Sequence, residues 1–317
     1  MKINENKILP ISLIVTSYNE AKNVEAWCNT LLAMSNYPNE LIVADSDSTD
    51  DTVSLLKHFL ASSPFRVVVL SGKCSISEGR NKSIKNASNE RIAISDFGVE
   101  FDSEWIGNIF SSLDQCDWVG GCYKLIWANK TQRSFCRIFD REPQTLNAET
   151  FLPSSRSFGI RKKIFLELGG YNTSLIIGED TEFVLKLKKI NAKYCLARNA
   201  IVYWYPRETL EQLYTQHFKY AYWDAVAGQN FMRLNHIVFW LVITVPVLLA
   251  IFFVNTVGLL MVLFALATIY IKVYKNISKS PFKGGATLYD CLVYYIVLTG
   301  GVVGYSIGTM RKKSFFK

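Results

Sequence analysis

The chain has 317 residues, 50% of them hydrophobic, and a formal net charge of +8. This length can bury one core of about 200 to 230 residues and leave further sequence over. Its seven cysteines form no CxxC pair and accompany no histidine cluster, so the composition argues against zinc and a disulfide framework and favours reduced, unpaired thiols. The basic residues are spread along the chain, which suits anionic lipid headgroups and diphosphate substrates rather than nucleic acid.

Short β-branched apolar runs alternate with helical stretches over the first hundred residues. The runs are continuous rather than alternating, as expected for strands covered on both faces; they span residues 11–18, 40–45, 66–71 and 91–96. The helical stretches between them span residues 21–34, 52–61 and 76–87. This succession predicts an α/β domain with a mostly parallel, Rossmann-like sheet between helices.

Polar residues follow the predicted strands at their carboxyl ends. Thr16, Tyr18 and Glu20 follow the first strand, Asp45 the second and Asp96 the fourth. Ligands of open α/β sheets bind at this edge, so these side chains are the first candidates for chemistry.

The chain has neither a GxGxxG turn after its first strand nor a P-loop, so we expect phosphates to be held another way. A Mg²⁺ or Mn²⁺ ion on Asp96 is the obvious alternative, because a diphosphate can complete the shell of oxygen ligands. An ordinary strand-end cap is the competing explanation for Asp96.

Several ordered motifs carry a resemblance to a known family. The segments ISLIVTSYNE, LIVADSDSTDDT, EGRNKSIKNASNERIAISD, GGYN and GEDTEF, within residues 10–225, together resemble the inverting family 2 glycosyltransferases of the GT-A fold. The resemblance implies a nucleotide-sugar donor, usually a UDP-sugar. It also implies roles in donor binding: Thr16, Tyr18 and Glu20 would line the base and ribose, Asp45 would contact the base, and Arg80 would lie near the nucleotide.

One position departs from the common pattern of that family. Many relatives have Asp-x-Asp after the fourth strand, whereas this chain has Gly98 in the second place. The sequence looks most like the subset that has Asp-x-Gly there. Three alternatives stay open for the metal: Asp96 binds it alone, Glu100 joins, or the site uses metal weakly.

An acid pair begins a predicted helix at residues 176–190, where Gly178 precedes Glu179 and Asp180. Acids at a helix N-terminus are ordinarily partners of the helix dipole. The resemblance implies more: Asp180 would be the catalytic base that takes the proton from the acceptor hydroxyl, and Glu179 would orient the acceptor or support the loop.

Three further residues are candidates for contact with the acceptor or the diphosphate. Ser155 and Arg156 lie in the polar stretch FLPSSRS, and hydroxyl and guanidinium groups suit phosphate oxygens. A solvent-exposed loop is the alternative. Trp204 would cover the acceptor or fill core space.

The last third of the chain changes in composition. An aromatic helix is predicted within residues 207–236 and is expected to lie in a membrane interface. Residues 237–317 then contain about three apolar segments, at 237–254, 257–271 and 288–310, each close to the length of a membrane span. We therefore expect a catalytic domain at residues 1–206, located in the cytosol because its N-terminus has no secretion signal, and a multi-pass anchor in a bacterial-type inner or plasma membrane.

The topology of the last segment is left open by its flanking charges. Lys272, Lys275, Lys279 and Lys283 precede it, and Arg311, Lys312, Lys313 and Lys317 follow it. Both groups prefer the cytosolic side, which requires that the last segment does not cross, for instance by bending at Gly300 and Gly301. We expect the preceding loop inside and assign no side to the tail.

The sequence as a whole predicts an inverting, UDP-sugar-dependent glycosyltransferase of hexosyltransferase type. It would modify a lipid-linked or glycan acceptor at the cytosolic membrane face, in polysaccharide or glycolipid synthesis. The competing hypothesis is a membrane-bound sugar-nucleotide sensor or scaffold without turnover. Gly98 favours that alternative, and the Gly-Glu-Asp triplet at 178–180 opposes it.

Overall fold

The computed structural model describes residues 7–229, 234–250, 252, 256–282 and 284–315. These fall into two compact units. Unit 1 comprises residues 1–124 and 143–204, and unit 2 comprises residues 125–142 and 205–317, in each case as far as they are described.

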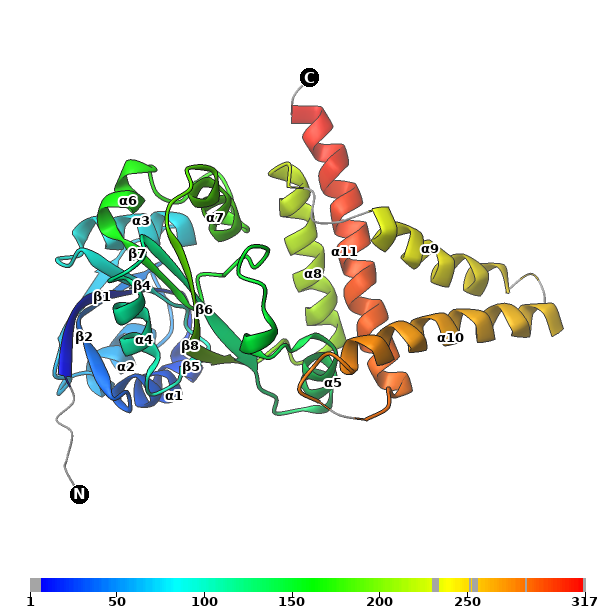
Figure 1. The fold of residues 1–317 in the computed structure, drawn as a ribbon, viewed down its shortest axis with the longest axis horizontal. Helices are drawn as coiled ribbons and strands as arrows, with labels where there is room; N and C mark the ends of the chain where they lie inside the picture. The colour runs from blue at the N-terminus through cyan, green and yellow to red at the C-terminus, as the bar shows by residue number, and fades with distance from the viewer. Residues whose placement is uncertain (1–6, 230–233, 251, 253–255, 283, 316–317) are drawn as a thin grey trace. The chain divides into compact units, whose positions relative to one another are not determined.

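Unit 1 contains a mixed sheet with the strand order β3-β2-β1-β4-β7-β6-β8-β5 (Figure 1). The strands are β1 Lys7–Ser17, β2 Asn36–Asp45, β3 Arg66–Ser71, β4 Arg91–Ile94, β5 Val99–Phe101, β6 Trp118–Leu125, β7 Phe158–Arg161 and β8 Tyr194–Trp204. The pairs β1–β2, β2–β3 and β1–β4 are parallel, as the sequence predicts. The pairs β4–β7, β6–β7 and β5–β8 are antiparallel.

Helices cover both faces of this sheet. They are α1 Ala21–Leu32, α2 Thr52–Phe59, α3 Ile76–Asn86, α4 Trp105–Ser112, α6 Lys162–Glu167 and α7 Glu179–Lys189, with a 3-10 turn at Pro143–Thr145. Side chains alternate along the strands: Leu13 packs in the core beneath α1, α2 and α4, whereas its neighbour Ile14 packs in the core beneath α3, α6 and α7. The predicted α/β architecture with two covered faces is therefore confirmed.

Unit 2 contains the remaining helices, α5 Lys130–Phe139, α8 Leu210–Val226, α9 Leu234–Leu249, α10 Thr256–Ile277 and α11 Leu288–Phe315. Residues 125–142 lie inside the range 1–206 that the sequence assigns to the catalytic domain, yet they pack in unit 2. The expected turn residue Asn255, together with Lys283 and Lys317, lies outside the described residues, as do the side chains of Lys312 and Lys313.

Two described helices are long and apolar enough to cross a membrane, α10 and the part of α11 at Leu288–Arg311. The apolar run that begins at Ile237 forms only a shorter helix, α9, in the described part of the chain. The expectation of about three apolar segments thus reduces to two of full length and one short helix.

Helix α11 continues without interruption through Gly300 and Gly301, where the sequence left a bend open. One detail of the sequence reading is wrong. Cys116 and Cys195 are not free thiols, because they are joined as a disulfide that links the start of β6 to β8. The two cysteines are separated by 79 residues, so local spacing could not reveal the pair.

Candidate active site

A cavity of about 480 Å³ opens at the carboxyl ends of β1 and β2. It is lined by Tyr18, Ser46, Asp47, Lys73, Cys74, Ser75 and Glu78. Tyr18 was predicted for this site, and its side chain is 60% exposed. Lys73, Cys74 and Ser75 were missed, because the loop between β3 and α3 carries no motif of its own, and Glu78 of α3 was missed although it lies in a quoted motif. Its position after a parallel strand was the available signal.

Asp45 is buried and does not line that cavity. Its carboxylate accepts hydrogen bonds from the Ser17 hydroxyl at 2.8 Å and from the Ser48 hydroxyl and N–H at 2.6 and 2.9 Å. These bonds fix the loop that follows β2, in which Asp47 has a positive φ of 53°. In the structure, Asp45 therefore shapes the cavity from within rather than facing into it.

Thr16 and Glu20 take different positions around the end of β1. Thr16 is half-buried beside Gly79 of α3, where a Cβ on the glycine would lie 3.2 Å from Thr16 Cγ2. The glycine thus lets α3 approach the strand ends closely. Glu20 accepts a hydrogen bond from the Asn23 amide at 2.6 Å, and its N–H donates to Thr52. Neither Thr16 nor Glu20 lines the cavity.

Arg80 joins the two predicted acid motifs. Its Nη2 donates to Oδ1 of Asp96 at 2.6 Å, and its Nη1 donates to Oε1 of Glu179 at 2.7 Å. The guanidinium also lies 5.5 Å from the centre of the Tyr171 ring. Arg80 is only 3% exposed, and its guanidinium bridges these two carboxylates inside the domain.

The charges of this bridge perturb one another. Burial alone would lower the pKa of Arg80, but Asp96, Glu179 and Asp180 outweigh it and raise that pKa. Burial raises the pKa of Glu179, while Arg80 opposes the rise and Asp180 adds to it. Arg80 therefore remains a cation. Its charge allows Glu179 and Asp180 of α7 to lie close to Asp96, which follows β4.

Asp180 lies beside Glu179 at the start of α7 and is half-buried. Its Oδ2 accepts the Ser155 N–H at 3.2 Å, and its Oδ1 accepts the Thr181 N–H at 2.7 Å. The hydroxyl groups of Ser155 and Tyr171 lie 3.1 Å apart. The predicted stretch at 154–157 therefore meets the predicted base in space.

Arg156 and Trp204 also come together. The Arg156 guanidinium lies 4.2 Å from the centre of the Trp204 ring and 5.8 Å from that of Tyr123. Ser95, one residue before Asp96, donates its hydroxyl to the Arg156 carbonyl at 2.7 Å. Trp204 is half-buried and packs against the core cluster beneath α1, α2 and α4.

Asp96 is the one predicted metal ligand. Among the described residues no group of three or more His, Cys, Asp or Glu could hold a metal ion. The Asp96 side chain is 30% exposed, and within the described residues its Oδ2 accepts no hydrogen bond. Gly98 has a positive φ of 79° and Glu100 pairs with Tyr203 across β5 and β8. The residues thus fit a cation held by one carboxylate oxygen and completed by oxygen atoms of a diphosphate.

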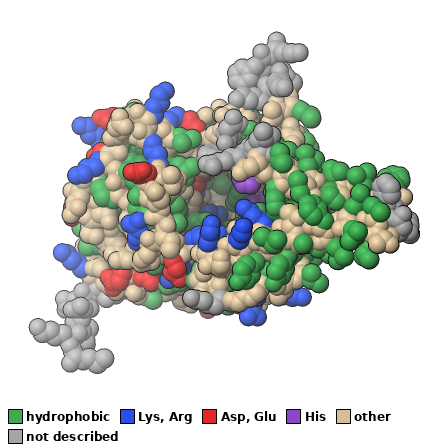
Figure 2. Space-filling model, turned by 45° about the vertical axis from the view of Figure 1, so that its right-hand side comes forward, with side chains coloured by type: hydrophobic (Ala, Val, Ile, Leu, Met, Phe, Trp, Pro, Cys, Tyr) green, Lys and Arg blue, Asp and Glu red, His purple; other side chains and the backbone are tan. Residues whose placement is uncertain are grey.

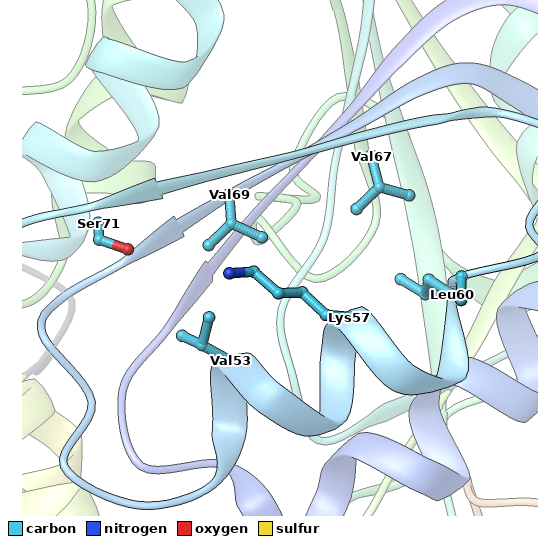
Figure 3. A pocket seen from close by; sticks show the side chains of 7 residues that line it. Val53, Lys57, Leu60, Val67, Val69 and Ser71 are labelled. Carbon is cyan, nitrogen blue, oxygen red and sulfur yellow. The ribbon is translucent and has the colours of Figure 1, made fainter.

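A second cavity lies elsewhere in unit 1, between α2 and the edge strand β3 (Figure 3). It measures about 310 Å³ and is lined by Val53, Lys57, Leu60, Ala61, Val67, Val69 and Ser71. Its lining is mainly aliphatic with a single lysine, and it contains none of the predicted site residues.

Two solved structures have a fold similar to that of this chain. The solved mannosyltransferase PcManGT from Pyrobaculum calidifontis, in complex with GDP-Man and Mn²⁺, is similar with a TM-score of 0.56 and 14% identity, covering 97% of this chain and 88% of that one. Residues 1–349 of TarS from S. aureus, in complex with UDP-GlcNAc, give a TM-score of 0.51 and 16% identity, covering 97% of this chain and 92% of that one. These identities show the fold alone.

Sequence similarity indicates to which protein family the chain is related. A protein of Haemophilus influenzae described as an uncharacterized glycosyltransferase is 25% identical over 183 residues, which is 56% of this chain and 61% of that relative. Residues 12–169 match the family model for glycosyl transferase family 2. They contain all the residues that the sequence predicts for donor binding, Thr16, Tyr18, Glu20, Asp45, Arg80 and Asp96. This part of the chain is therefore similar to glycosyl transferase family 2 domains, and its sheet is GT-A-like.

Proposed function

We propose that the protein is an inverting glycosyltransferase that moves a sugar from a nucleotide-sugar, preferentially a UDP-sugar, to a lipid-linked or glycan acceptor. The observation that carries the proposal is the Arg80 bridge. One buried guanidinium holds Asp96, at the donor edge of the sheet, and Glu179, next to Asp180. A donor subsite and a catalytic base on either side of one cation are what group transfer between two substrates requires.

Asp180 acts as the general base. It takes the proton of the acceptor hydroxyl while that oxygen attacks the anomeric carbon, and the bond to the nucleoside diphosphate breaks on the opposite face. Such a base contributes roughly 10² to 10⁴ in rate. The Ser155 N–H orients its carboxylate. Glu179 is buried against Arg80, which supports a role in positioning the loop rather than in contacting the acceptor.

The donor base and ribose occupy the cavity lined by Tyr18, with Asp45 fixing the loop around it. Asp96 would hold a Mg²⁺ or Mn²⁺ ion through Oδ2. When bound, such an ion stabilises the negative charge of the departing diphosphate. The Mn²⁺ complex of the similar mannosyltransferase supports this proposal.

On the acceptor side, Arg156 with Trp204 and Tyr123 offers an aromatic face and a cation beside Ser155. Guanidinium groups bind phosphate oxygens in a bidentate manner, which suits a phosphate-bearing lipid carrier. The apolar helices α10 and α11 support a membrane location, with the catalytic unit in the cytosol.

The experiment is a panel of nucleotide-sugars offered to membranes that contain the protein and a lipid extract. Wild type should release the nucleoside diphosphate with one donor of the panel. Asp180→Asn should abolish release and leave donor binding nearly intact. Glu182→Gln, in the same helical turn, removes only an ion pair with Lys186 at 2.9 Å and is the matched control. Equal release by wild type and Asp180→Asn would refute the base assignment.

The alternative, a sensor or scaffold without turnover, has Gly98 as its support. It predicts donor binding without release for every donor and acceptor in the panel. Because the assay reads binding and release separately, it distinguishes the two functions.

A further inference from the structure

Helix α11 is long and apolar enough to cross a membrane, but much of its surface is used inside the protein. Within its most apolar window 56% is buried, compared with 22% for α10. The large exposed apolar side chains of α11 are Leu288, Leu292, Ile307 and Met310. A helix that crosses a membrane can be covered by lipid or by other helices, so the element that covers α11 decides where α11 can lie.

Helix α8 covers it along its C-terminal half. A Cβ at Gly300, Gly304 or Gly308 would lie 2.6, 2.2 or 2.4 Å from the backbone oxygen of Tyr214, Phe218 or Tyr222, respectively. The residue numbers rise in the same direction on both helices, so α8 and α11 run parallel, as Figure 1 shows. At the three glycines their backbones are in contact. Arg311 also donates to the Tyr222 hydroxyl. Wherever this half of α11 lies in a membrane, α8 must lie with it.

Helix α8 is poorly suited to a hydrocarbon environment. Glu211 and Lys219 are exposed, and Lys219 directly follows Phe218, the residue that faces Gly304. Charged side chains in the bilayer core are costly and normally face a partner or a water-filled space. An α11 that crossed the bilayer would carry Lys219 into that core.

The α9–α10 hairpin has the opposite character. Helix α9 contacts α11 through the middle of its length, where Trp240 donates to Thr299 and Thr244 bonds to Tyr295. Both helices then lead away from the α8–α11 pair (Figure 1), and Figure 2 shows hydrophobic side chains gathered over them. The exposed large apolar residues here include Leu241, Val245, Leu248, Leu259, Leu260, Leu263, Phe264 and Ile271.

Exposed lysines and hydrogen-bonded residues lie at the end of α10 and directly after it. Lys275 and Lys279 are exposed at the end of α10. The loop that follows is bound to α5, since Arg137 donates to the Gly285 carbonyl at 2.6 Å and Thr131 bonds to Tyr289 at 2.9 Å. Because α5 lies between β6 and β7 in the chain, the polypeptide enters and leaves α5 from the catalytic unit, and a loop bonded to α5 is expected on the same side of a membrane as that unit.

We propose that the α9–α10 hairpin is the element that enters the lipid bilayer, while α8 and α11 lie together along its surface, with both ends of α11 on the catalytic side. The occupant of the apolar hairpin surface is lipid, and Lys275 and Lys279 meet the anionic headgroups. Helix α9 has 16 residues, which is about 24 Å of helix. A hydrocarbon core is roughly 30 Å thick, so α9 by itself is too short to span it. This inference goes beyond the proposed function and does not depend on turnover.

The test places one cysteine at either end of α11. Leu288→Cys and Met310→Cys replace side chains that are 76% and 70% exposed. Each variant is probed with a membrane-impermeant maleimide in sealed vesicles of both orientations, with the parent chain giving the background of native thiols. Both cysteines should react in the same preparation and to a similar extent. Reaction in opposite preparations, or in neither, would overturn the proposal.

A second measurement identifies what covers the hairpin. A fluorophore on Leu263→Cys of α10 and one on Ile307→Cys of α11 are compared in vesicles with lipids brominated at shallow or deep positions. The α10 probe should be quenched most by the deep label and the α11 probe by the shallow one. A hairpin covered by a second copy of the chain would leave the α10 probe unquenched and let Leu263→Cys form a disulfide-linked dimer, which would refute the lipid contact. Leu292→Cys replaces Leu288→Cys if the latter misfolds.

Discussion

Replacing Arg80 by methionine tests whether the buried bridge holds the site together. The guanidinium is 3% exposed and makes two charge-assisted hydrogen bonds, of 2.6 and 2.7 Å. Such bonds are each worth about 1.5 to 3 kcal/mol. The bond to Asp96 belongs near the lower limit because that carboxylate is partly exposed. Arg80→Met should therefore destabilise the catalytic unit by about 3 to 5 kcal/mol.

The loss should depend on pH in a defined direction. Burial raises the pKa of Glu179 and Arg80 opposes the rise, so removing Arg80 raises that pKa further. A carboxyl group whose folded pKa is raised stabilises the fold below its unfolded pKa, about 4.3, and loses that contribution as the pH rises through the folded value. The destabilisation should consequently grow between about pH 5 and pH 8.

Thermal unfolding in detergent measures both effects. A loss of this size corresponds to a fall on the order of 10 °C in melting temperature for a unit of this length. Lys57→Met, at an exposed lysine, is the matched control and should change stability by less than about 0.5 kcal/mol. Arg80→Met/Glu179→Met removes both partners and should recover part of the loss. A variant no less stable than the control, or one that gains stability with rising pH, would refute the reasoning.

Three further outcomes are expected. Gly304→Ala should destabilise unit 2 by about 1 to 3 kcal/mol despite the better helix propensity of alanine, because its Cβ would lie 2.2 Å from the Phe218 oxygen. Thermal unfolding against Ile307→Ala, on the exposed face, measures this. Glu40→Gln should lower the melting temperature at neutral pH. Burial alone would raise the pKa of Glu40, but hydrogen bonds from Ser12 and Ser88 and the charge of Arg66 lower it, so its stabilisation is present above about pH 4.3 and the difference from wild type should close in acid. Asp96→Ala should weaken donor binding and diphosphate release together, and full wild-type release in excess EDTA would contradict the metal proposal.

The parallel half of the sheet was predictable because strands buried on both faces are continuous apolar runs. The antiparallel half was not. β5 is only the three residues Val99–Phe101, too short for a periodic signal. Its partner β8 is mostly half-buried, and its apolar run at 200–204 follows the polar residues Arg198 and Asn199. Pairing between distant segments such as these depends on tertiary packing that no local pattern records.

The candidate site was likewise predictable only in part: the motif positions were predictable, but the contacts between them were not. Motif positions led to Asp96, Arg80 and Glu179 separately, but a bond between residues 99 positions apart joins them. The resemblance suggested that Arg80 lies near the nucleotide, and the structure adds two carboxylate partners that no local motif records. Gly300 and Gly301 left a bend possible, since glycine disfavours helix. Helix α11 continues through them, and the missing Cβ of Gly300 leaves room for the backbone of α8, a neighbour that the local sequence of α11 does not record.

The excursion of residues 125–142 has a practical consequence for anyone who wishes to study the catalytic unit alone. The chain passes between the units after Lys124, after Glu142 and after Trp204. Ending the polypeptide at Trp204 would remove α8 to α11 but retain α5, with Phe135, Cys136 and Ile138 stripped of their cover and prone to aggregate. A soluble enzyme requires a second cut, in which residues 125–142 are replaced by a polar linker.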